Sequence, residues 1–236
     1  SFGGEHRMIL LDLSEYQTPE SLEKLLGKSA VTSVFCDAVR RYPAHLLLLD
    51  EFEKAHPDVL NIFLQIFEDG RLTDGRGQTL NFAHAFVIAT SNVGSSKVYK
   101  GLSEGKPIEE IRKEVIDIEL PRAMRPELIN RFDKVVFFRP LSIQNMIPIV
   151  QLQLAPLRQA LDQRGVRFEI SEEAIEEFAR KGYDPTFGAR GLRRLLQDTL
   201  EEEVARILLE GDVHRRDTIV VSQGGLVSVQ RATKLQ

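Results

Sequence analysis

The sequence lacks the features that mark membrane proteins, secreted proteins and dedicated nucleic-acid binders. Its longest apolar stretches stop well short of the roughly 20 residues that cross a bilayer. Its start, SFGGEHRMILLD, has neither the basic lead nor the long apolar core of a signal peptide. The formal net charge is -4, whereas a nucleic-acid binder would carry a basic surplus. We therefore expect no membrane span and no nucleic-acid partner.

Cysteine is almost absent as well. The single Cys36 cannot form an internal disulfide or supply a thiolate metal cluster. A reducing compartment is therefore the expected location, the cytoplasm first and an organelle matrix as the alternative. Because no histidine stands near Cys36 in the sequence, we interpret it as an ordinary helix residue rather than a reactive thiol.

The pattern over the first two thirds of the chain is typical of a parallel α/β fold. The 236 residues are 42% hydrophobic and 28% charged, values of a folded chain that can form one large domain or two smaller ones. Short apolar runs alternate with helical patterns, as strands and crossover helices do. They predict strands, buried on both faces, at residues 8–11, 46–49, 86–90 and 135–138. Helices are expected near residues 19–26, 32–41, 57–67 and 108–118.

After Arg139-Pro140 the pattern changes to long amphipathic helices. These are expected at residues 143–164, 171–181 and 188–210, with short strands at 167–170 and 218–221. We therefore expect a large α/β subdomain over residues 1–138, with flanking helices around a parallel sheet. A small, mostly helical α+β subdomain should follow over residues 139–236.

Two adjacent acids end the leucine run of the second predicted strand. Asp50 and Glu51 should lie at the carboxyl edge of the sheet, where open α/β folds bind ligands. In a phosphate-transfer site, Asp50 would hold Mg²⁺ through a water shell and Glu51 would orient or deprotonate the attacking water. The plainer alternative is a strand end followed by solvated acids.

Three further side chains fit a polyphosphate site. Asn92 follows the next strand, where its amide could hydrogen-bond a water or a γ-phosphate oxygen. Arg131 stands at a helix end before the strand predicted at 135–138, and Arg190 at the start of a helix in the second subdomain. Fixed guanidinium groups stabilise charge on terminal phosphate oxygens. For either arginine alone, a surface salt bridge is the competing interpretation.

In this order the motifs resemble the AAA+ ATPases of the Clp and heat-shock family, in particular the second ATPase domain of a ClpB-like disaggregase. The resemblance covers most of the chain, and the segments KAHPDV and GRLTDG after the two acids are its most specific part. The matching stretches are MILLDLSEY (8–16), AVRRYP (38–43), LLLLDEFEKAHPDVLNIFLQIFEDGRLTDGRGQTLNF (46–82), VIATSNVGSS (87–96), MRPELINRFDKVVFFRPLS (124–142) and GYDPTFGARGLRRLLQ (182–197).

The resemblance implies a role for each candidate. Asp50 and Glu51 match the Walker B acids, Asn92 the sensor-1 residue, Arg131 the arginine finger that acts on a neighbouring subunit, and Arg190 the sensor-2 arginine. Arg125 is the second candidate for a trans-acting arginine, with a structural ion pair as the alternative. The hairpin-like stretch 70–78 corresponds to a loop that faces the ring's channel, although its Gly and Asp content would also produce an ordinary tight turn.

The sequence departs from the family's pattern in three places. It holds no G-x-x-x-x-G-K-[ST] loop, so we expect a fragment that begins after the P-loop and hydrolyses ATP poorly by itself. Between Gly27 and Ala38 the aromatic-hydrophobic-glycine loop that grips a translocating polypeptide is missing, and Phe35 reads as a buried helix residue. Residues 97–118 lack the apolar-glycine-phenylalanine tripeptide that docks a peptidase.

The resemblance implies an ATP-dependent unfoldase or disaggregase module. Its cofactors would be ATP and Mg²⁺. Its partners would be identical subunits in a hexamer and misfolded or unfolded polypeptides, with co-chaperones as further candidates. Two alternatives stay open: the regulatory ATPase of a Clp protease, and a ring-forming scaffold with no competent nucleotide site.

Overall fold

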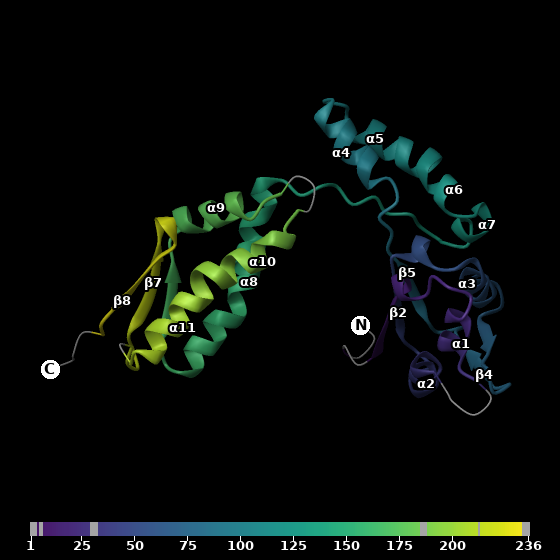
Figure 1. The fold of residues 1–236 in the computed structure, drawn as a ribbon, viewed down its shortest axis with the longest axis horizontal. Coiled ribbons are helices and arrows are strands. Elements are labelled where there is room, and N and C mark those ends of the chain that lie inside the picture. The colour runs from purple at the N-terminus through teal and green to yellow at the C-terminus, as the bar shows by residue number, and fades with distance from the viewer. Residues whose placement is uncertain (1–3, 5–6, 29–32, 185–187, 212, 233–236) are drawn as a thin grey trace. The chain divides into compact units, whose positions relative to one another are not determined.

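The computed structural model describes residue 4 and residues 7–28, 33–184, 188–211 and 213–232. The chain divides into two compact units, Ser1–Phe137 and Phe138–Gln236 (Figure 1). The boundary expected from the sequence lies one residue later. Each unit has its own hydrophobic core.

A parallel sheet organises the first unit. Its strands lie in the order β1 (Met8–Asp12), β2 (Leu46–Asp50), β5 (Phe86–Ala89). The register pairs Asp12 with Asp50 and Leu49 with Ala89, so the three strands end at nearly the same level. The strands predicted at 8–11, 46–49 and 86–90 are confirmed, and so is the α/β fold class.

One face of this sheet carries the core. Ile9, Leu11, Leu47 and Leu49 are buried on it. The helices that supply the rest of this core are α1 (Ser21–Leu26), α2 (Val34–Arg41) and α3 (Pro57–Asp69). Phe35 lies in α2 and is buried, as predicted.

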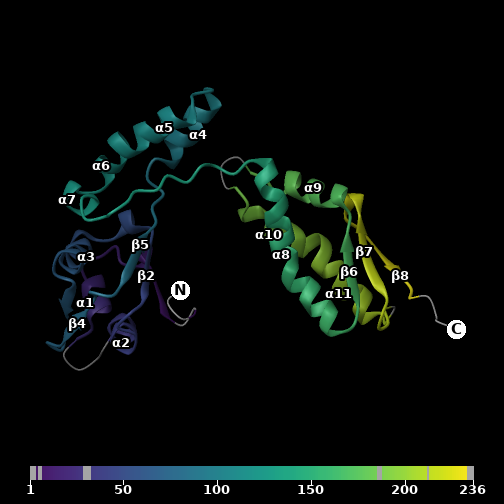
Figure 2. The same cartoon turned by 180° about the vertical axis from the view of Figure 1, so that it is seen from behind.

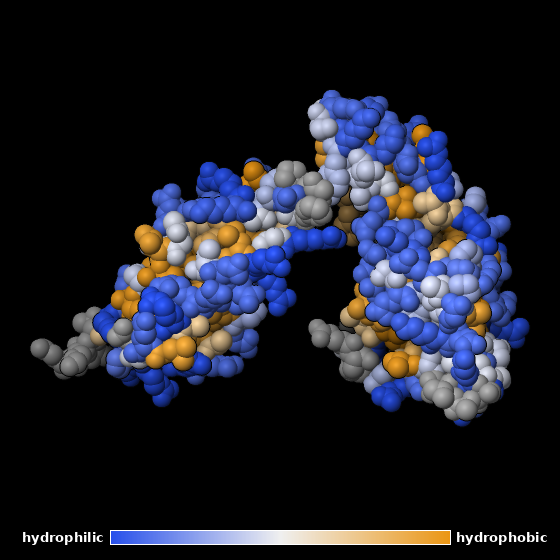
Figure 3. Space-filling model, viewed as in Figure 1, coloured by the Kyte–Doolittle hydropathy of each residue, from blue (hydrophilic) through white to orange (hydrophobic). Residues whose placement is uncertain are grey.

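The prediction that the strands are buried on both faces is wrong. Met8, Leu10, Phe86 and Ile88 are between 41% and 57% exposed, so the second face stays open in the described chain. Figure 3 shows apolar side chains, in orange, on the surface of the first unit near β1 and β2. The prediction failed because an apolar run shows only that a strand is apolar on both faces. It does not show whether a helix covers each face.

Helix α3 begins six residues after Glu51 and packs against the turn that follows the two acids. Pro57 occupies its first turn, where a missing N–H costs nothing, and Gly70 ends it at φ 63°. Its buried residues Val59, Phe63 and Ile66 recur at helical spacing. The ring of Phe63 meets that of Phe52, fully buried one residue after Glu51, at a centroid distance of 5.9 Å. This contact anchors the chain that leaves β2.

The rest of the first unit is an antiparallel hairpin and a row of short helices. The hairpin strands are β3 (Arg71–Thr73) and β4 (Thr79–Asn81). The helices are α4 (Ser95–Ser103), α5 (Ile108–Glu114), a π-helical turn (Val115–Glu119), α6 (Leu120–Ala123) and α7 (Pro126–Ile129).

The strand predicted at 135–138 is wrong. These residues form no strand in the structure, and Val136 and Phe138 are 61% and 87% exposed. Phe137 instead packs against a small cluster of Val98, Ile111 and Val115. A strand needs a neighbour for its N–H and C=O groups, and among the described strands β5 pairs with β2 alone.

The second unit packs helices against a small mixed sheet (Figure 2). Its helices are α8 (Ile143–Gln163), α9 (Glu172–Lys181), α10 (Arg190–Leu196) and α11 (Glu202–Leu209), with a π-helical turn at Gln197–Glu201. Strand β6 (Arg167–Ile170) runs parallel to β7 (Thr218–Ser222), which pairs antiparallel with β8 (Leu226–Gln230). The helix predicted at 188–210 is found as α10, the π-helical turn and α11, and of the strands only β8 was not predicted. Among the described residues, no helix combines the length and the apolar character that a membrane crossing requires.

His45 immediately precedes β2 and is fully buried. Its Nδ1 lies 2.8 Å from the carbonyl oxygen of Tyr42, so Nδ1 must carry the hydrogen. Its Nε2 is buried without a hydrogen-bond partner among the described residues. A proton on Nε2 would therefore be unpaired, and burial lowers the pKa of His45, against the opposing effect of the backbone hydrogen bonds.

This lowered pKa predicts an acid-sensitive fold. Below about pH 6.5 the unfolded chain binds a proton at this histidine and the folded chain resists it. The free energy of unfolding should therefore decrease as the pH is lowered. For this one group the decrease is at most about 1.4 kcal/mol per pH unit. Urea unfolding of the chain between pH 7.5 and 5.5 should show a weaker pH dependence in His45→Gln. The exposed His84→Gln is the matched control, and equal slopes in all three proteins would contradict the prediction.

Candidate functional site

The two acids leave the sheet at its carboxyl edge. Asp50 is the last residue of β2, and residues 90–92 continue from the end of the adjacent strand β5. Because β2 and β5 are parallel and in register, both segments emerge side by side. The structure therefore brings together Asp50, Glu51 and Asn92, three of the five residues that the sequence singled out.

Thr90 links the two acids. Its hydroxyl donates to Asp50 Oδ1 and accepts from the Glu51 N–H at 3.3 Å. Its backbone takes part as well: the Thr90 N–H donates to the carbonyl of Leu49 at 2.8 Å, and its carbonyl accepts from the Phe52 N–H at 3.0 Å. One residue at the end of β5 thus holds the whole turn from Leu49 to Phe52.

Glu51 adopts a left-handed backbone conformation, with φ 51° and ψ 48°. A non-glycine residue pays on the order of 1 kcal/mol for this conformation, which persists only where the surroundings hold it. Here the holding contacts are the Phe52 N–H on Thr90 and the Lys54 N–H on the Glu51 carbonyl, at 2.9 Å. Because the backbone turns at Glu51, the carboxylates of Asp50 and Glu51 point in other directions than they would in a continuing strand.

Asn92 contacts Glu51 directly. Its side-chain amide nitrogen donates to Glu51 Oε1 at 3.1 Å. The Asn92 N–H donates to Glu53 Oε1 at 3.0 Å, and the Asn92 carbonyl accepts from the N–H and the hydroxyl of Ser95 at 3.2 and 2.7 Å. A carboxylate base and an uncharged amide that contact each other in this way can together orient a water beside them.

The arginines near the end of the first unit lie along α3. Arg131 donates to Glu68, and Arg125 donates to Asn61 Oδ1 at 2.7 Å. Asn61 and Glu68 are seven residues apart, two helical turns, so they share one face of α3. The side chains of Arg131 and Glu68 are 47% and 40% exposed, so this ion pair is solvated and contributes little to stability.

Arg190 lies in the second unit, where it begins α10 as predicted. It is exposed and lines an open groove that holds three arginines and two acids. The lining residues are Asp184, Arg190, Gly191, Arg193, Arg194, Gln197 and Asp198. A surplus of guanidinium groups at such a groove suits an anionic ligand.

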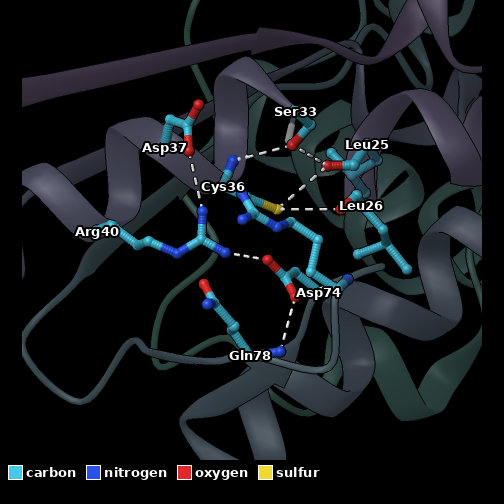
Figure 4. Close-up of polar contacts among 9 residues, drawn as sticks. Leu25, Leu26, Ser33, Cys36, Asp37, Arg40, Asp74 and Gln78 are labelled. Atoms are coloured by element: carbon cyan, nitrogen blue, oxygen red, sulfur yellow. Dashed lines mark hydrogen bonds and ion pairs between the residues drawn. The ribbon is translucent and has the colours of Figure 1, made fainter. Parts of the chain in front are cut away.

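The stretch 70–78 contains the hairpin's turn, and Asp74 holds it (Figure 4). One carboxylate oxygen accepts from the N–H groups of Arg76 and Gln78 at 2.9 and 2.8 Å, and the other accepts from Arg40 of α2. Burial by itself would raise the pKa of Asp74, but these backbone hydrogen bonds and the Arg40 guanidinium outweigh it, so the pKa lies below its ordinary value.

The same turn presses against the chain that follows α1. The Gly75 N–H donates to the Leu26 carbonyl at 3.1 Å. A Cβ on Gly75 would come within 2.2 Å of the Gly27 carbonyl oxygen, so only glycine fits this contact. The sequence lacks the family's gripping loop between Gly27 and Ala38. Residues 29–32 of that stretch lie outside the described residues.

Cys36 belongs to the same neighbourhood and is an ordinary buried helix residue, as interpreted from the sequence (Figure 4). Its Sγ lies 3.5 and 3.6 Å from the carbonyl oxygens of Leu25 and Leu26. Burial raises the pKa of the thiol, with smaller opposing contributions from Ser33 and Arg40. The thiolate is therefore disfavoured at neutral pH.

Comparison with known families matches nearly the whole chain. Residues 1–135 match the family described as AAA domain (Cdc48 subfamily). This match covers more than half of the chain. The chain belongs to the AAA domain family. Residues 141–221 match a second family, the C-terminal, D2-small domain of ClpB protein. The resemblance to the second ATPase domain of a ClpB-like protein is thus confirmed.

Comparison with curated relatives agrees with this family assignment. The chain is 41% identical over 231 residues to the chaperone protein ClpB of Meiothermus ruber, covering 95% of this chain and 27% of that protein. It is 36% identical to the mitochondrial chaperone protein ClpB4 of Arabidopsis thaliana, covering 96% of this chain and 25% of that protein. It is 37% identical to the ATP-dependent Clp protease ATP-binding subunit ClpE of Streptococcus pneumoniae, covering 100% of this chain and 32% of that protein. The chain spans about a quarter to a third of these relatives' lengths.

Two polar residues of this site, Thr90 and Glu53, were not identified from the sequence. Thr90 was counted as part of a strand, and Glu53 was not singled out at all. Each acts through a contact some 40 residues away along the chain, so no local pattern announces it. The polar residue at the end of an apolar strand was the one available signal, and it pointed to Thr90.

The Asp74 network predicts an unequal pair of substitutions. Asp74→Ala removes a buried carboxylate that accepts from the N–H groups of Arg76 and Gln78 and from Arg40, and should lower the free energy of unfolding by about 1–3 kcal/mol. Asp37→Ala removes a half-exposed partner of the same Arg40, and should cost less than about 1 kcal/mol. Urea denaturation of both variants measures the difference. Similar losses would show that the turn does not depend on Asp74.

Proposed function

We propose that this AAA domain is an ATP-driven protein-remodelling module, an unfoldase or disaggregase that works within a hexameric ring. The observation that carries the proposal is the Asn92 amide on Glu51, one residue after the sheet-edge acid Asp50. A carboxylate base, a magnesium-holding carboxylate and an uncharged water-orienting amide are what hydrolysis of a nucleoside triphosphate requires. Misfolded or unfolded polypeptides would be the substrates.

Each site residue has its own part in the proposed reaction. Glu51 would accept a proton from, or orient, the attacking water, while the Asn92 amide holds the Glu51 carboxylate and the water in line. Asp50 offers hard carboxylate oxygens, the ligand type that Mg²⁺ prefers, and so fits the ion. The ion, when bound, neutralises phosphate charge. Arg190 would contact the nucleotide's phosphates from its groove.

Arg131 would act on the nucleotide of a neighbouring subunit. Its contact with Glu68 is solvated on both sides, so the guanidinium can leave it at small cost. Arg125 is the second candidate for this part, although its bond to Asn61 accounts for it structurally. The 70–78 hairpin would face the channel, with its turn fixed to α2 by Asp74.

A second candidate function is the regulatory ATPase of a Clp protease, because one relative bears the name of such a subunit. The residues of the site would act in the same way, and only the consumer of the unfolded polypeptide would differ. A pull-down with the peptidase distinguishes the two. A reducing compartment, cytoplasm or organelle matrix, fits either function.

Substitution of the proposed base tests the function. In the natural full-length protein, Glu51→Gln should lower ATP turnover roughly 100-fold or more, because an amide cannot take the proton. ATP binding should persist, since Glu51 is not among the groups proposed to hold the phosphates. Steady-state turnover and binding of a fluorescent ATP analogue are the measurements, with the exposed Glu110→Gln as control. Undiminished turnover in Glu51→Gln would refute the proposed function.

Mixing two inactive variants tests the trans role of Arg131. Arg131→Ala and Glu51→Gln should each be inactive as uniform rings. In rings mixed at random from equal amounts, roughly a quarter of the interfaces join an intact Glu51 to an intact Arg131, so about that share of turnover should return. Tagged subunits confirm mixing. Mixed rings that regain no activity would contradict a trans role.

A further inference from the structure

Glu53 touches the proposed site without being one of its expected residues. It lies in a single 3-10 turn, Phe52–Lys54, immediately after the acids. Its Oε1 accepts the Asn92 N–H at 3.0 Å. Its Oε2 is buried, with no hydrogen-bond partner among the described residues. Glu53 is therefore not a fully solvated acid, and within the described parts of the chain its carboxylate hydrogen-bonds the residue that reaches Glu51.

Asn92 is held at both backbone groups, and only its side chain is left to act. Glu53 takes its N–H, and Ser95 donates twice to its carbonyl. With the backbone fixed, the amide nitrogen reaches Glu51 Oε1 at 3.1 Å. Without Glu53, the N–H would lose its acceptor within the protein, and the turn between β5 and α4 would be free to shift. A displacement of about 1 Å is enough to disrupt catalytic alignment.

Asn92 also stands between two carboxylates of the same short turn. It gives its backbone N–H to Glu53 and its side-chain N–H to Glu51. Both donors are neutral, so one oxygen of each carboxylate is hydrogen-bonded without a countercharge that would compete for phosphate. This bridge ties the acid-bearing turn after β2 to the amide-bearing turn after β5.

We propose that Glu53 is a positioning residue, whose carboxylate sets the place of Asn92 and thereby the alignment of the Asn92 amide with Glu51. The inference rests on the proposed function, because it assigns Glu53 to the same hydrolytic site. Glu53 acts through Asn92 and contacts no reacting atom. Its effect should therefore fall on the rate of turnover rather than on nucleotide binding.

Three substitutions in the natural full-length protein test this role. Glu53→Ala removes the acceptor and should lower kcat roughly 10- to 100-fold, the usual effect of losing an orienting partner, with KM for ATP changed by less than about threefold. Glu53→Gln keeps a carbonyl oxygen for the Asn92 N–H and should stay within about threefold of the unaltered protein. Glu110→Ala, an exposed acid on α5, is the control.

A double-mutant cycle separates positioning from plain stability. Because Glu53 works through Asn92, adding Glu53→Ala to Asn92→Ala should cause little further loss of kcat. If Glu53→Ala does not fold, as judged by its thermal unfolding, Glu53→Asp takes its place in the cycle. Additive losses, a KM effect alone, or equal losses in Glu53→Ala and Glu53→Gln would each overturn the proposal.

The outcome also separates this inference from the proposed function. If Glu51→Gln keeps its turnover, the hydrolytic assignment itself fails. If Glu51→Gln loses turnover while Glu53→Ala matches the Glu110→Ala control, only the positioning role of Glu53 is refuted.

Discussion

The in-register parallel pairing of β2 with β5 is the constraint on which the candidate site depends. It sets Leu49 against Ala89, so Asp50 and Thr90 leave the sheet at one level. From there two backbone hydrogen bonds, Thr90 N–H to Leu49 and Phe52 N–H to Thr90, fasten the two exits to each other. A slip of one residue would turn every side chain of one strand to the opposite face and separate the acids from Asn92.

The leucines of β2 and the aromatic cluster below it enforce this register. Leu47 and Leu49 are fully buried, and a pairing shifted by one residue would turn them out of the core. Phe52 is fully buried between Phe63 and Phe132 one residue after Glu51. The left-handed conformation of Glu51 is therefore imposed from both sides, by the strand before it and by the ring after it.

The sequence was sufficient to predict the features that depend on a local pattern of residues. The acids at the end of an apolar run, strands β6 and β7 of the second unit and the start of α10 at Arg190 were all predicted. It failed where a partner far along the chain decides. Residues 135–138 have strand composition but no described neighbour to pair with, and the partners of Arg131 and Asn92 lie 63 and 39 residues away. Periodicity and propensity carry no information about such pairs.

The resting partner of Arg131 decides whether a role on a neighbouring subunit is physically reasonable. An arginine buried with a carboxylate could leave only by stranding a charge, at a cost of several kcal/mol. Arg131 and Glu68 are both about half exposed, so water replaces either partner and the pair contributes on the order of 0–1 kcal/mol. A phosphate group offers the guanidinium a charge-assisted, bidentate contact that is stronger than this. The ion pair can therefore hold Arg131 in the isolated chain without opposing its transfer to a nucleotide.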